Sequence, residues 1–143
     1  MIRVRTACDG DLPAIFALFR DELGREPTPA LTTVWVRDFP SAVAEDDEAL
    51  VGFAYAKRFA PDVLELANIV VSADRRGAGL GQLLLAHVEA TAVADYGGII
   101  LTNSDLYADG KTAKRPATAF YLRAGFELLA ATAATRMFYK ALR

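Results

Sequence analysis

A glycine-rich turn links the most apolar segment of the sequence to a helical pattern. Residues 75–81 read Arg-Arg-Gly-Ala-Gly-Leu-Gly, between the apolar run 63–71 and a helical pattern in which Leu80, Leu83 and Leu84 mark one apolar face. At such a junction of strand and helix, successive backbone N–H groups converge at the positive end of the helix dipole. Glycine lets a ligand approach the backbone closely and adopts positive φ without strain. The turn therefore predicts a binding site for a phosphate or pyrophosphate group.

Two other phosphate-binding motifs do not fit this sequence. A dinucleotide-binding fingerprint that begins at Gly77 requires a third glycine where the chain has Gln82. The segment Gly110-Lys111-Thr112 matches the end of a P-loop, but the first glycine of that motif would fall at Asp105. A tight turn that binds no ligand remains the alternative to a phosphate site.

Glu65 and Asn68 are the polar residues that interrupt the apolar run 63–71. Because side chains alternate along a strand, Glu65 and Val71 are predicted to share one face, with Asn68 on the other unless a β-bulge intervenes. Burial of a carboxylate raises its pKa toward values that suit a general base. Glu65 is therefore a candidate base, and an ion pair at the end of the strand is the alternative.

The chain around these residues alternates between strand and helix patterns. We expect strands at 2–6, 41–45, 49–58, 63–71, 99–102, 126–132 and 135–142, with helices from Leu12 to Gly24, at 30–38, from Leu80 to near Gly97 and from Pro116 to Ala124. The nearly continuous apolar character of 63–71 predicts a central strand. The strand-helix-strand unit in the middle predicts one parallel pair in a mixed sheet, so the fold class is α/β or α+β.

Length and charge limit the classes of protein that fit. With 143 residues, of which 53% are hydrophobic and 24% charged, the chain has the size and composition of one ordered domain spanning residues 1–143. The formal net charge is −2, and no basic stripe of the kind that neutralises nucleic-acid phosphates stands out. We therefore expect no nucleic-acid partner.

Cysteine and histidine occur once each. Cys8 alone forms no intramolecular disulfide, and with His87 as the single histidine a Cys/His zinc site is excluded. We expect Cys8 to be a small buried residue and His87 to pack on the apolar face of its helix. No apolar segment approaches the roughly 20 residues that span a bilayer, and the N-terminal residues lack the apolar core of a signal peptide. A cytoplasmic protein without a membrane partner is expected.

Two sequence patterns, the first of them within the glycine-rich turn, follow each other along the chain. Residues 76–81 fit Arg/Gln-x-x-Gly-x-Gly/Ala, and residues 117–126 fit Ala-x-x-x-Tyr-x-x-x-Gly-Phe. Together they resemble the GCN5-related N-acetyltransferase (GNAT) superfamily, and residues 137–142 are similar to its final strand. The chain departs from the family at Ala73, where a proline is common, and at Lys114, where many relatives carry asparagine. The resemblance implies a single GNAT-like domain, with a mixed, mostly antiparallel central sheet of about six to seven strands flanked by about four helices.

The resemblance implies acetyl-CoA or CoA as the cofactor, with no metal. The backbone of Ile69 and Val71 would pair with the pantetheine arm, and the Val71 N–H would polarise the thioester carbonyl. The pyrophosphate would be bound by the backbone N–H groups of Arg76, Gly77, Ala78, Gly79, Leu80 and Gly81. Lys114 would contact the cofactor, because it occupies the position of the family's asparagine.

Two side chains receive catalytic roles from the same resemblance. Tyr121 matches a tyrosine near the cofactor sulfur, where its phenol would protonate the leaving thiolate as a general acid. A packed aromatic whose hydroxyl only satisfies a hydrogen bond is the alternative. Glu65 stands where some relatives carry a catalytic glutamate that deprotonates the amine directly or through water. The ion pair remains its alternative role.

The implied enzyme is an acetyl-CoA-dependent N-acetyltransferase. It would move an acetyl group to a primary amine by direct attack on the thioester through a tetrahedral intermediate. Segments 20–38 and 127–137 would form the acceptor pocket. They carry both acidic and basic residues, so their charge does not indicate whether the acceptor is a small-molecule amine or a peptide or protein amine. A homodimer is expected by family analogy alone. The alternatives are a non-catalytic acyl-CoA-binding or regulatory module and an unrelated nucleotide-binding domain.

Overall fold

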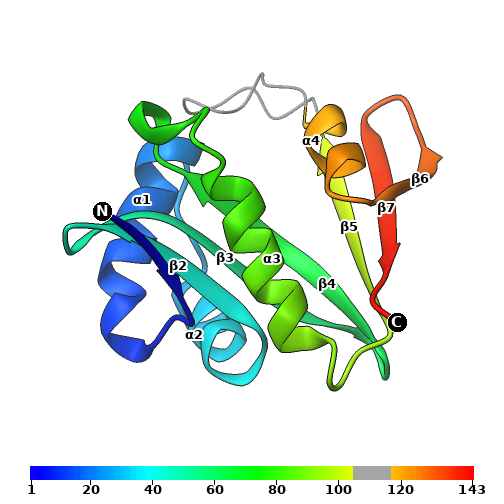
Figure 1. The fold of residues 1–143 in the computed structure, drawn as a ribbon, viewed down its shortest axis with the longest axis horizontal. Helices are drawn as coiled ribbons and strands as arrows, with labels where there is room; N and C mark the ends of the chain where they lie inside the picture. Colours follow the sequence, from blue (N-terminus) through cyan, green and yellow to red (C-terminus); the bar gives the residue numbers. More distant parts are fainter. Residues whose placement is uncertain (105–116) are drawn as a thin grey trace.

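Seven strands form one mixed sheet in the computed structural model, which describes residues 1–104 and 117–143 (Figure 1). The strands are β1 (Ile2–Arg5), β2 (Ser41–Asp46), β3 (Ala49–Ala60), β4 (Val63–Val71), β5 (Gly98–Ser104), β6 (Glu127–Ala131) and β7 (Thr135–Ala141). They lie in the order β1-β2-β3-β4-β5-β7-β6, and each neighbouring pair is antiparallel except β4 and β5. The predicted mixed, mostly antiparallel sheet is confirmed.

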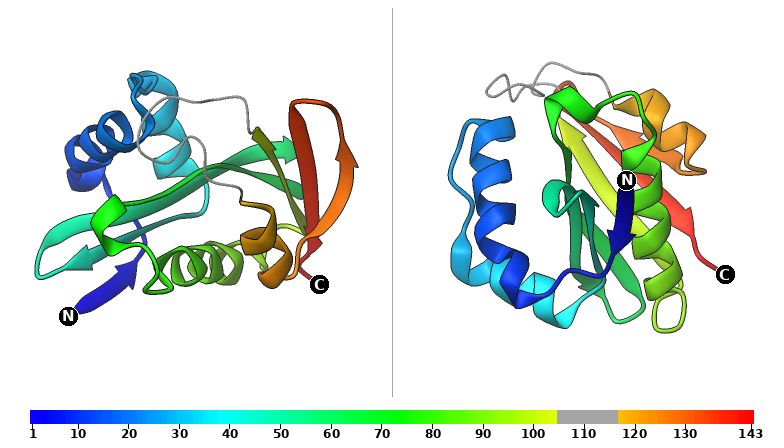
Figure 2. Two further views of the ribbon diagram at one scale, coloured as in Figure 1. Left: turned by 90° about the horizontal axis from the view of Figure 1, so that it is seen from above. Right: turned by 60° about the vertical axis from the view of Figure 1, so that its left-hand side comes forward.

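Within the described residues, four α-helices flank the sheet. They are α1 (Leu12–Leu23), α2 (Pro29–Asp38), α3 (Leu80–Ala92) and α4 (Thr118–Arg123), with 3-10 turns η1 (Asp9–Asp11) and η2 (Ala73–Arg75). Figure 2 shows α1 and α2 on one face of the sheet and α3 on the other. Helix α1 ends where the sequence predicts, because Gly24 takes a left-handed conformation and donates its N–H to the Arg20 carbonyl at 3.0 Å.

One apolar cluster lies on each face of the sheet. Leu84 and Val88 of α3 belong to one cluster, and Ile15 and Phe19 of α1 belong to the other. Burial of each such side chain contributes about 1.5–3 kcal/mol to stability. The prediction was wrong for Leu83, which is 51% exposed rather than part of the buried face of α3.

Two further expectations about local structure are corrected. Helix α3 ends at Ala92 rather than near Gly97, because the Ala92 carbonyl accepts the N–H groups of both Asp95 and Tyr96 and closes the last turn. Cys8 is exposed rather than buried, because η1 begins at the next residue on the protein surface.

Strands β4 and β5 separate along the sheet, and their divergence is visible in Figure 1. They pair in parallel over Val63–Glu65 of β4, which confirms the predicted parallel pair. Beyond that point β5 stays paired with β7 and β4 stays paired with β3. The outer edge of β4 after Glu65 therefore lacks β5 as a partner.

Candidate active site

A cleft of about 1030 Å³ lies where β4 and β5 separate. Its walls come from the second half of β4, the glycine-rich turn with the start of α3, the end of β5, and α4. The predicted site residues in its lining are Ile69, Val71, Arg76, Gly77, Gly79, Leu80, Gly81 and Tyr121. Ala78 lies between two of these glycines in the same turn. The structure thus brings together residues that lie up to 52 positions apart in the sequence.

The outer backbone of β4 faces this cleft. Ser72 donates its N–H to the Val51 carbonyl at 2.8 Å, which continues the ladder between β4 and β3. Because backbone groups alternate between the two edges of an antiparallel strand, Ile69 and Val71 present theirs to the edge away from β3. With β5 already separated, the Val71 N–H and both Ile69 backbone groups are positioned to pair with an extended chain added to the sheet as a further strand.

The glycine-rich turn presents backbone amides at the start of α3. Gly77 and Gly79 have φ of +86° and +79°, a region that other residues enter only with strain. Gly79 caps α3, and its carbonyl accepts the N–H of Leu83 at 3.2 Å. The amides of Leu80, Gly81 and Gln82 precede that bond and have no helical acceptor. This cradle fits a pyrophosphate group, because the amides and the helix dipole both favour an anion.

Arg76 is held by a buried carboxylate rather than left free in the cleft. One guanidinium nitrogen, Nη2, donates to Oε1 of Glu22 at 2.6 Å and to the Val71 carbonyl at 3.2 Å. Glu22 is 1% exposed, and its Oε2 accepts the N–H of Ala73 at 3.1 Å. Glu22 is not among the residues predicted for the site. The buried residues of α1 are Leu12, Ile15, Phe19 and Glu22, so helical spacing alone places Glu22 on the buried face.

Tyr121 combines burial with access to the cleft. It is 7% exposed, lines the cleft and packs edge-on against Phe120 and Phe126. Burial raises the pKa of the Tyr121 phenol to about 12, since the low-dielectric surroundings disfavour the phenolate. The phenol therefore keeps its proton at neutral pH and is available as a hydrogen-bond or proton donor.

A β-bulge in β4 changes the faces on which its residues lie. Tyr55 of β3 pairs with Asn68 and Ala56 pairs with Leu66, so Ala67 is the extra residue. Before the bulge Leu66 belongs to the cluster on the α3 face, and after it Val71 packs against the same cluster. The alternation therefore shifts by one residue at Ala67.

The prediction that Glu65 and Val71 share a face is wrong as a result of this bulge. Val71 packs on the α3 face, whereas the Glu65 carboxylate lies 3.8 Å from Nζ of Lys57 on the opposite face. There Nζ of Lys57 also lies 4.9 Å from the centre of the Trp35 ring. Glu65 is not part of the cleft lining, whereas Asn68 is. The observed contact of Glu65 is the ion pair considered as its alternative role.

Lys114 lies outside the described residues, and Asn103 lines the cleft from β5. In the part of the chain that the structure describes, no group of three or more His, Cys, Asp or Glu side chains could hold a metal ion. None of the helices in residues 1–104 and 117–143 is both long enough and apolar enough to cross a membrane.

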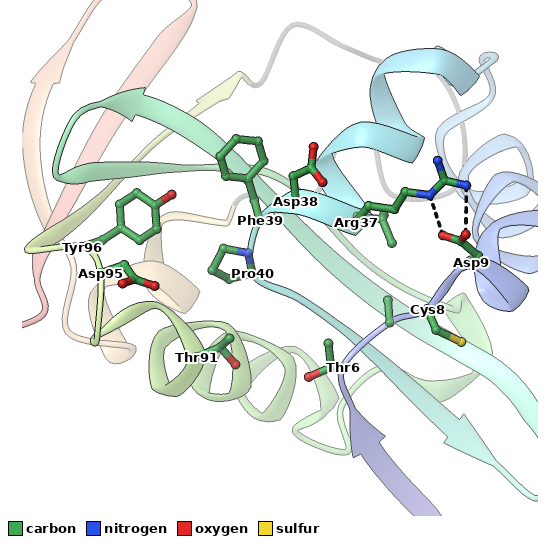
Figure 3. A pocket seen from close by; sticks show the side chains of 12 residues that line it. Thr6, Cys8, Asp9, Arg37, Asp38, Phe39, Pro40, Thr91, Asp95 and Tyr96 are labelled. Carbon is green, nitrogen blue, oxygen red and sulfur yellow. Dashed lines mark hydrogen bonds and ion pairs between the residues drawn. The ribbon is translucent and has the colours of Figure 1, made fainter.

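A second hollow of about 460 Å³, shown in Figure 3, lies between η1, the end of α2 and the end of α3. Arg37 and Asp9 form two hydrogen bonds across its rim, at 2.8 and 2.9 Å. Thr6 lines the same hollow, and its hydroxyl is hydrogen-bonded to Nε2 of His87 at 2.9 Å. None of the predicted catalytic or cofactor-binding residues lines this hollow, although Val36, Arg37 and Asp38 of the predicted acceptor segment 20–38 do.

Solved structures with the same fold include several acetyltransferases. The ribosomal-protein-S18-alanine N-acetyltransferase of Escherichia coli has a TM-score of 0.80 at 18% identity, covering 99% of this chain and 94% of that chain. The PaiA N-acetyltransferase of Thermoplasma acidophilum, in complex with coenzyme A, has a TM-score of 0.74 at 17% identity, covering 99% of both chains. The phosphinothricin acetyltransferase of Sinorhizobium meliloti, in complex with acetyl-CoA, has a TM-score of 0.75 at 21% identity, covering 98% of this chain and 88% of that chain. These likenesses establish the fold.

Family membership is shown by the sequence itself. No curated protein sequence matches the chain significantly. The family model for the acetyltransferase (GNAT) domain, however, matches residues 32–128, which is more than half of the chain. The matched segment contains the glycine-rich turn and Tyr121. The resemblance inferred from the two motifs is thereby confirmed, and the chain belongs to the GNAT family of acetyl-CoA-dependent N-acetyltransferases.

Proposed function

We propose that this chain transfers an acetyl group from acetyl-CoA directly to a primary amine, without a metal ion or a covalent enzyme intermediate. The observation that carries the proposal is the opening between β4 and β5. Around this opening lie the outer backbone of Ile69 and Val71, the amides at the start of α3, and the phenol of Tyr121. Each satisfies a different requirement of acetyl transfer.

Backbone groups bind the donor in this proposal. The amides of Leu80, Gly81 and their neighbours in the glycine-rich turn bind the pyrophosphate. Ile69 and Val71 pair with the pantetheine arm, which lies along the open edge of β4 as an added strand. The charge of Arg76 is already balanced by Glu22, so the amides rather than this guanidinium provide the main attraction for the phosphates.

Acetyl-CoA supplies an acetyl group activated as a thioester. The amine nitrogen forms a bond to the thioester carbon, and the Val71 N–H stabilises the negative charge that develops on the carbonyl oxygen. As the carbon–sulfur bond breaks, Tyr121 gives its proton to the sulfur. The proton released by the amine passes through water and restores the phenol. The products are the N-acetyl amine and the free thiol.

Glu65 forms only its ion pair in this proposal and has no catalytic role, because it does not line the cleft and lies beside Lys57. A Glu65→Gln variant tests this assignment. We expect a change of less than about threefold in kcat, which corresponds to the ion pair alone. A fall of 10²-fold or more, the range of general base catalysis, would instead assign the base to Glu65.

Turnover of a panel of primary amines tests the proposed function directly. The panel contains a polyamine, free amino acids, peptides with free N-termini and an aminoglycoside, and release of the CoA thiol is followed for each. We expect thiol release with at least one amine, and loss of that activity in Tyr121→Phe. Binding of CoA without thiol release from any amine in the panel would favour a non-catalytic CoA-binding protein.

A further inference from the structure

Glu22 occupies a position that is unfavourable for a carboxylate in two ways. In the part of the chain that the structure describes, it is the one charged side chain that is buried. Burial of a charge is costly unless the charge is paired and hydrogen-bonded. Glu22 also lies in the last turn of α1, where the helix dipole disfavours a negative charge. The role of Glu22 must therefore lie in what its carboxylate contacts.

Both carboxylate oxygens of Glu22 contact the segment that joins β4 to α3. Oε1 lies 2.6 Å from Nη2 of Arg76, and Oε2 accepts the N–H of Ala73 at 3.1 Å. These two residues are at opposite ends of the short stretch 73–76, directly before Gly77. The carboxylate therefore fixes the approach of the chain to the glycine-rich turn from α1, an element far away in the sequence.

Arg76 extends these contacts to the end of β4. Its Nη2 donates to the Val71 carbonyl at 3.2 Å, and its side chain is 17% exposed. The Val71 carbonyl lies on the cleft edge of β4, beside the Val71 N–H that is proposed to stabilise the oxyanion. A hydrogen bond to this carbonyl limits rotation of the backbone at Val71. Contacts therefore run from Glu22 through Arg76 to Val71. They connect the glycine-rich turn, which is proposed to bind phosphate, with the Val71 backbone, which is proposed to stabilise the oxyanion.

We propose that Glu22 is a positioning residue, which acts through Arg76 to hold the phosphate-binding turn and the Val71 backbone in the geometry that binds CoA. The inference rests on the proposed function, because it assigns the CoA site to this cleft. Glu22 is buried and itself contacts no substrate. Its contribution is the correct placement of Arg76 and Ala73, with the charge of Arg76 neutralised in the process.

A double-mutant cycle on this pair separates positioning from general stability. The variants are Glu22→Gln, Arg76→Gln and the double variant, and the measured quantities are the Kd for CoA by calorimetry and the melting temperature. Each single change leaves a charge facing an amide, so we expect CoA to bind about tenfold more weakly in each. In the double variant two amides can restore a neutral hydrogen bond, and we expect affinity within about threefold of the wild type.

Asp9→Asn is the matched control, because Asp9 also pairs with an arginine but lies at the rim of the second hollow. Its CoA affinity should equal that of the wild type. The inference is overturned if the single variants melt at lower temperature yet bind CoA with wild-type affinity, or if the double variant is as weak as the two single losses combined. Arg76→Gln leaves Glu22 a neutral donor and provides the test if Glu22→Gln does not fold. Absence of CoA binding in the wild type would contradict the proposed function itself.

Discussion

The cleft between β4 and β5 and the second hollow of Figure 3 differ in what their polar groups contact. In the cleft, the backbone groups of Ile69 and Val71 on the outer edge of β4 are not paired with a neighbouring strand. The first amides of α3 likewise have no acceptor within the helix. In the second hollow, Arg37 and Asp9 already pair with each other through two hydrogen bonds. Polar groups that lack a partner within the fold, like these backbone groups of the cleft, are available to bind a ligand.

The same contrast explains the chemistry expected of each region. The cleft offers backbone donors fixed by a sheet and a helix, which can stabilise charge without rearranging. The Asp9 and Arg37 side chains satisfy each other, and this pairing lowers the pKa of Asp9 and raises that of Arg37. Both groups therefore stay charged and paired at neutral pH. Variants in the two regions should differ sharply in their effect on the reaction.

The largest expected effect follows from Tyr121→Phe, which removes the proposed proton donor and leaves the packed ring. We expect kcat to fall about 10²-fold, within the range for loss of a general acid, while the Kd for CoA changes less than about twofold. Steady-state rates with an accepted amine and calorimetry with CoA measure the two quantities. An unchanged kcat would leave Tyr121 with a packing role only.

The raised pKa of Tyr121 predicts the pH dependence of the same step. A pKa of about 12 means that the phenol keeps its proton well into alkaline solution, so its donor form is lost only as pH rises through that value. The pH profile of kcat should therefore show no decline due to Tyr121 up to about pH 10. A decline near neutral pH that Tyr121→Phe abolishes would contradict this assignment.

A smaller effect is expected from Gly79→Ala, with Gly10→Ala in η1 as its control. Gly79 has φ of +79° and nothing within 4 Å of an added Cβ, so the cost is backbone strain of about 1–2 kcal/mol. Relaxation of that strain would misplace the amides, and we expect the Kd for CoA to rise about tenfold. Gly10 lacks this conformation, and its variant should bind CoA normally. Equal affinities for both variants would argue against the phosphate cradle.

Gly81→Ala is expected to affect stability more than binding. An added Cβ would lie 2.9 Å from Cε1 of Phe120, so either the Phe120 ring or helix α4 would have to shift. Overpacking of this kind costs about 1–3 kcal/mol. Thermal melting should show a fall of several degrees. A melting temperature equal to that of the wild type would mean that Phe120 can move aside, as the alanine tolerated by the family signature at this position suggests.

The smallest effect is expected in the second hollow. Arg37→Ala breaks the pair with Asp9 at an exposed site, and exposed pairs contribute little. CoA affinity and kcat should stay within about twofold of the wild type. A large loss of CoA binding would show that the second hollow is coupled to the cleft. It would contradict the expectation that only the cleft takes part in CoA binding.

The elements and the glycine-rich turn could be predicted because their signals are local. Gly24 ends α1 and Pro29 begins α2 through their own backbone properties. The two motifs likewise consist of residues close together in the sequence, and they contain six predicted site residues that line the cleft: Arg76, Gly77, Gly79, Leu80, Gly81 and Tyr121. A continuous apolar run correctly predicted the central position of β4.

The features that could not be predicted depend on contacts between distant residues. The bulge at Ala67 arises from the register between β3 and β4, and alanine carries no signal for it. The partner of Glu22 is 54 residues away, so the pair with Arg76 could not be inferred, although the spacing in α1 indicated burial. The exposure of Cys8 depends on the path of the chain between β1 and η1.

The central claim is that the cleft between β4 and β5 binds CoA through the glycine-rich turn. Calorimetric titration with acetyl-CoA, CoA, ATP and NAD, repeated on Gly79→Glu, tests it most directly. Acetyl-CoA and CoA should bind, and neither ATP nor NAD should. The glutamate, which adds a negative charge at the anion site, should abolish binding. Absence of binding by both CoA species, or binding that Gly79→Glu leaves unchanged, would contradict the claim.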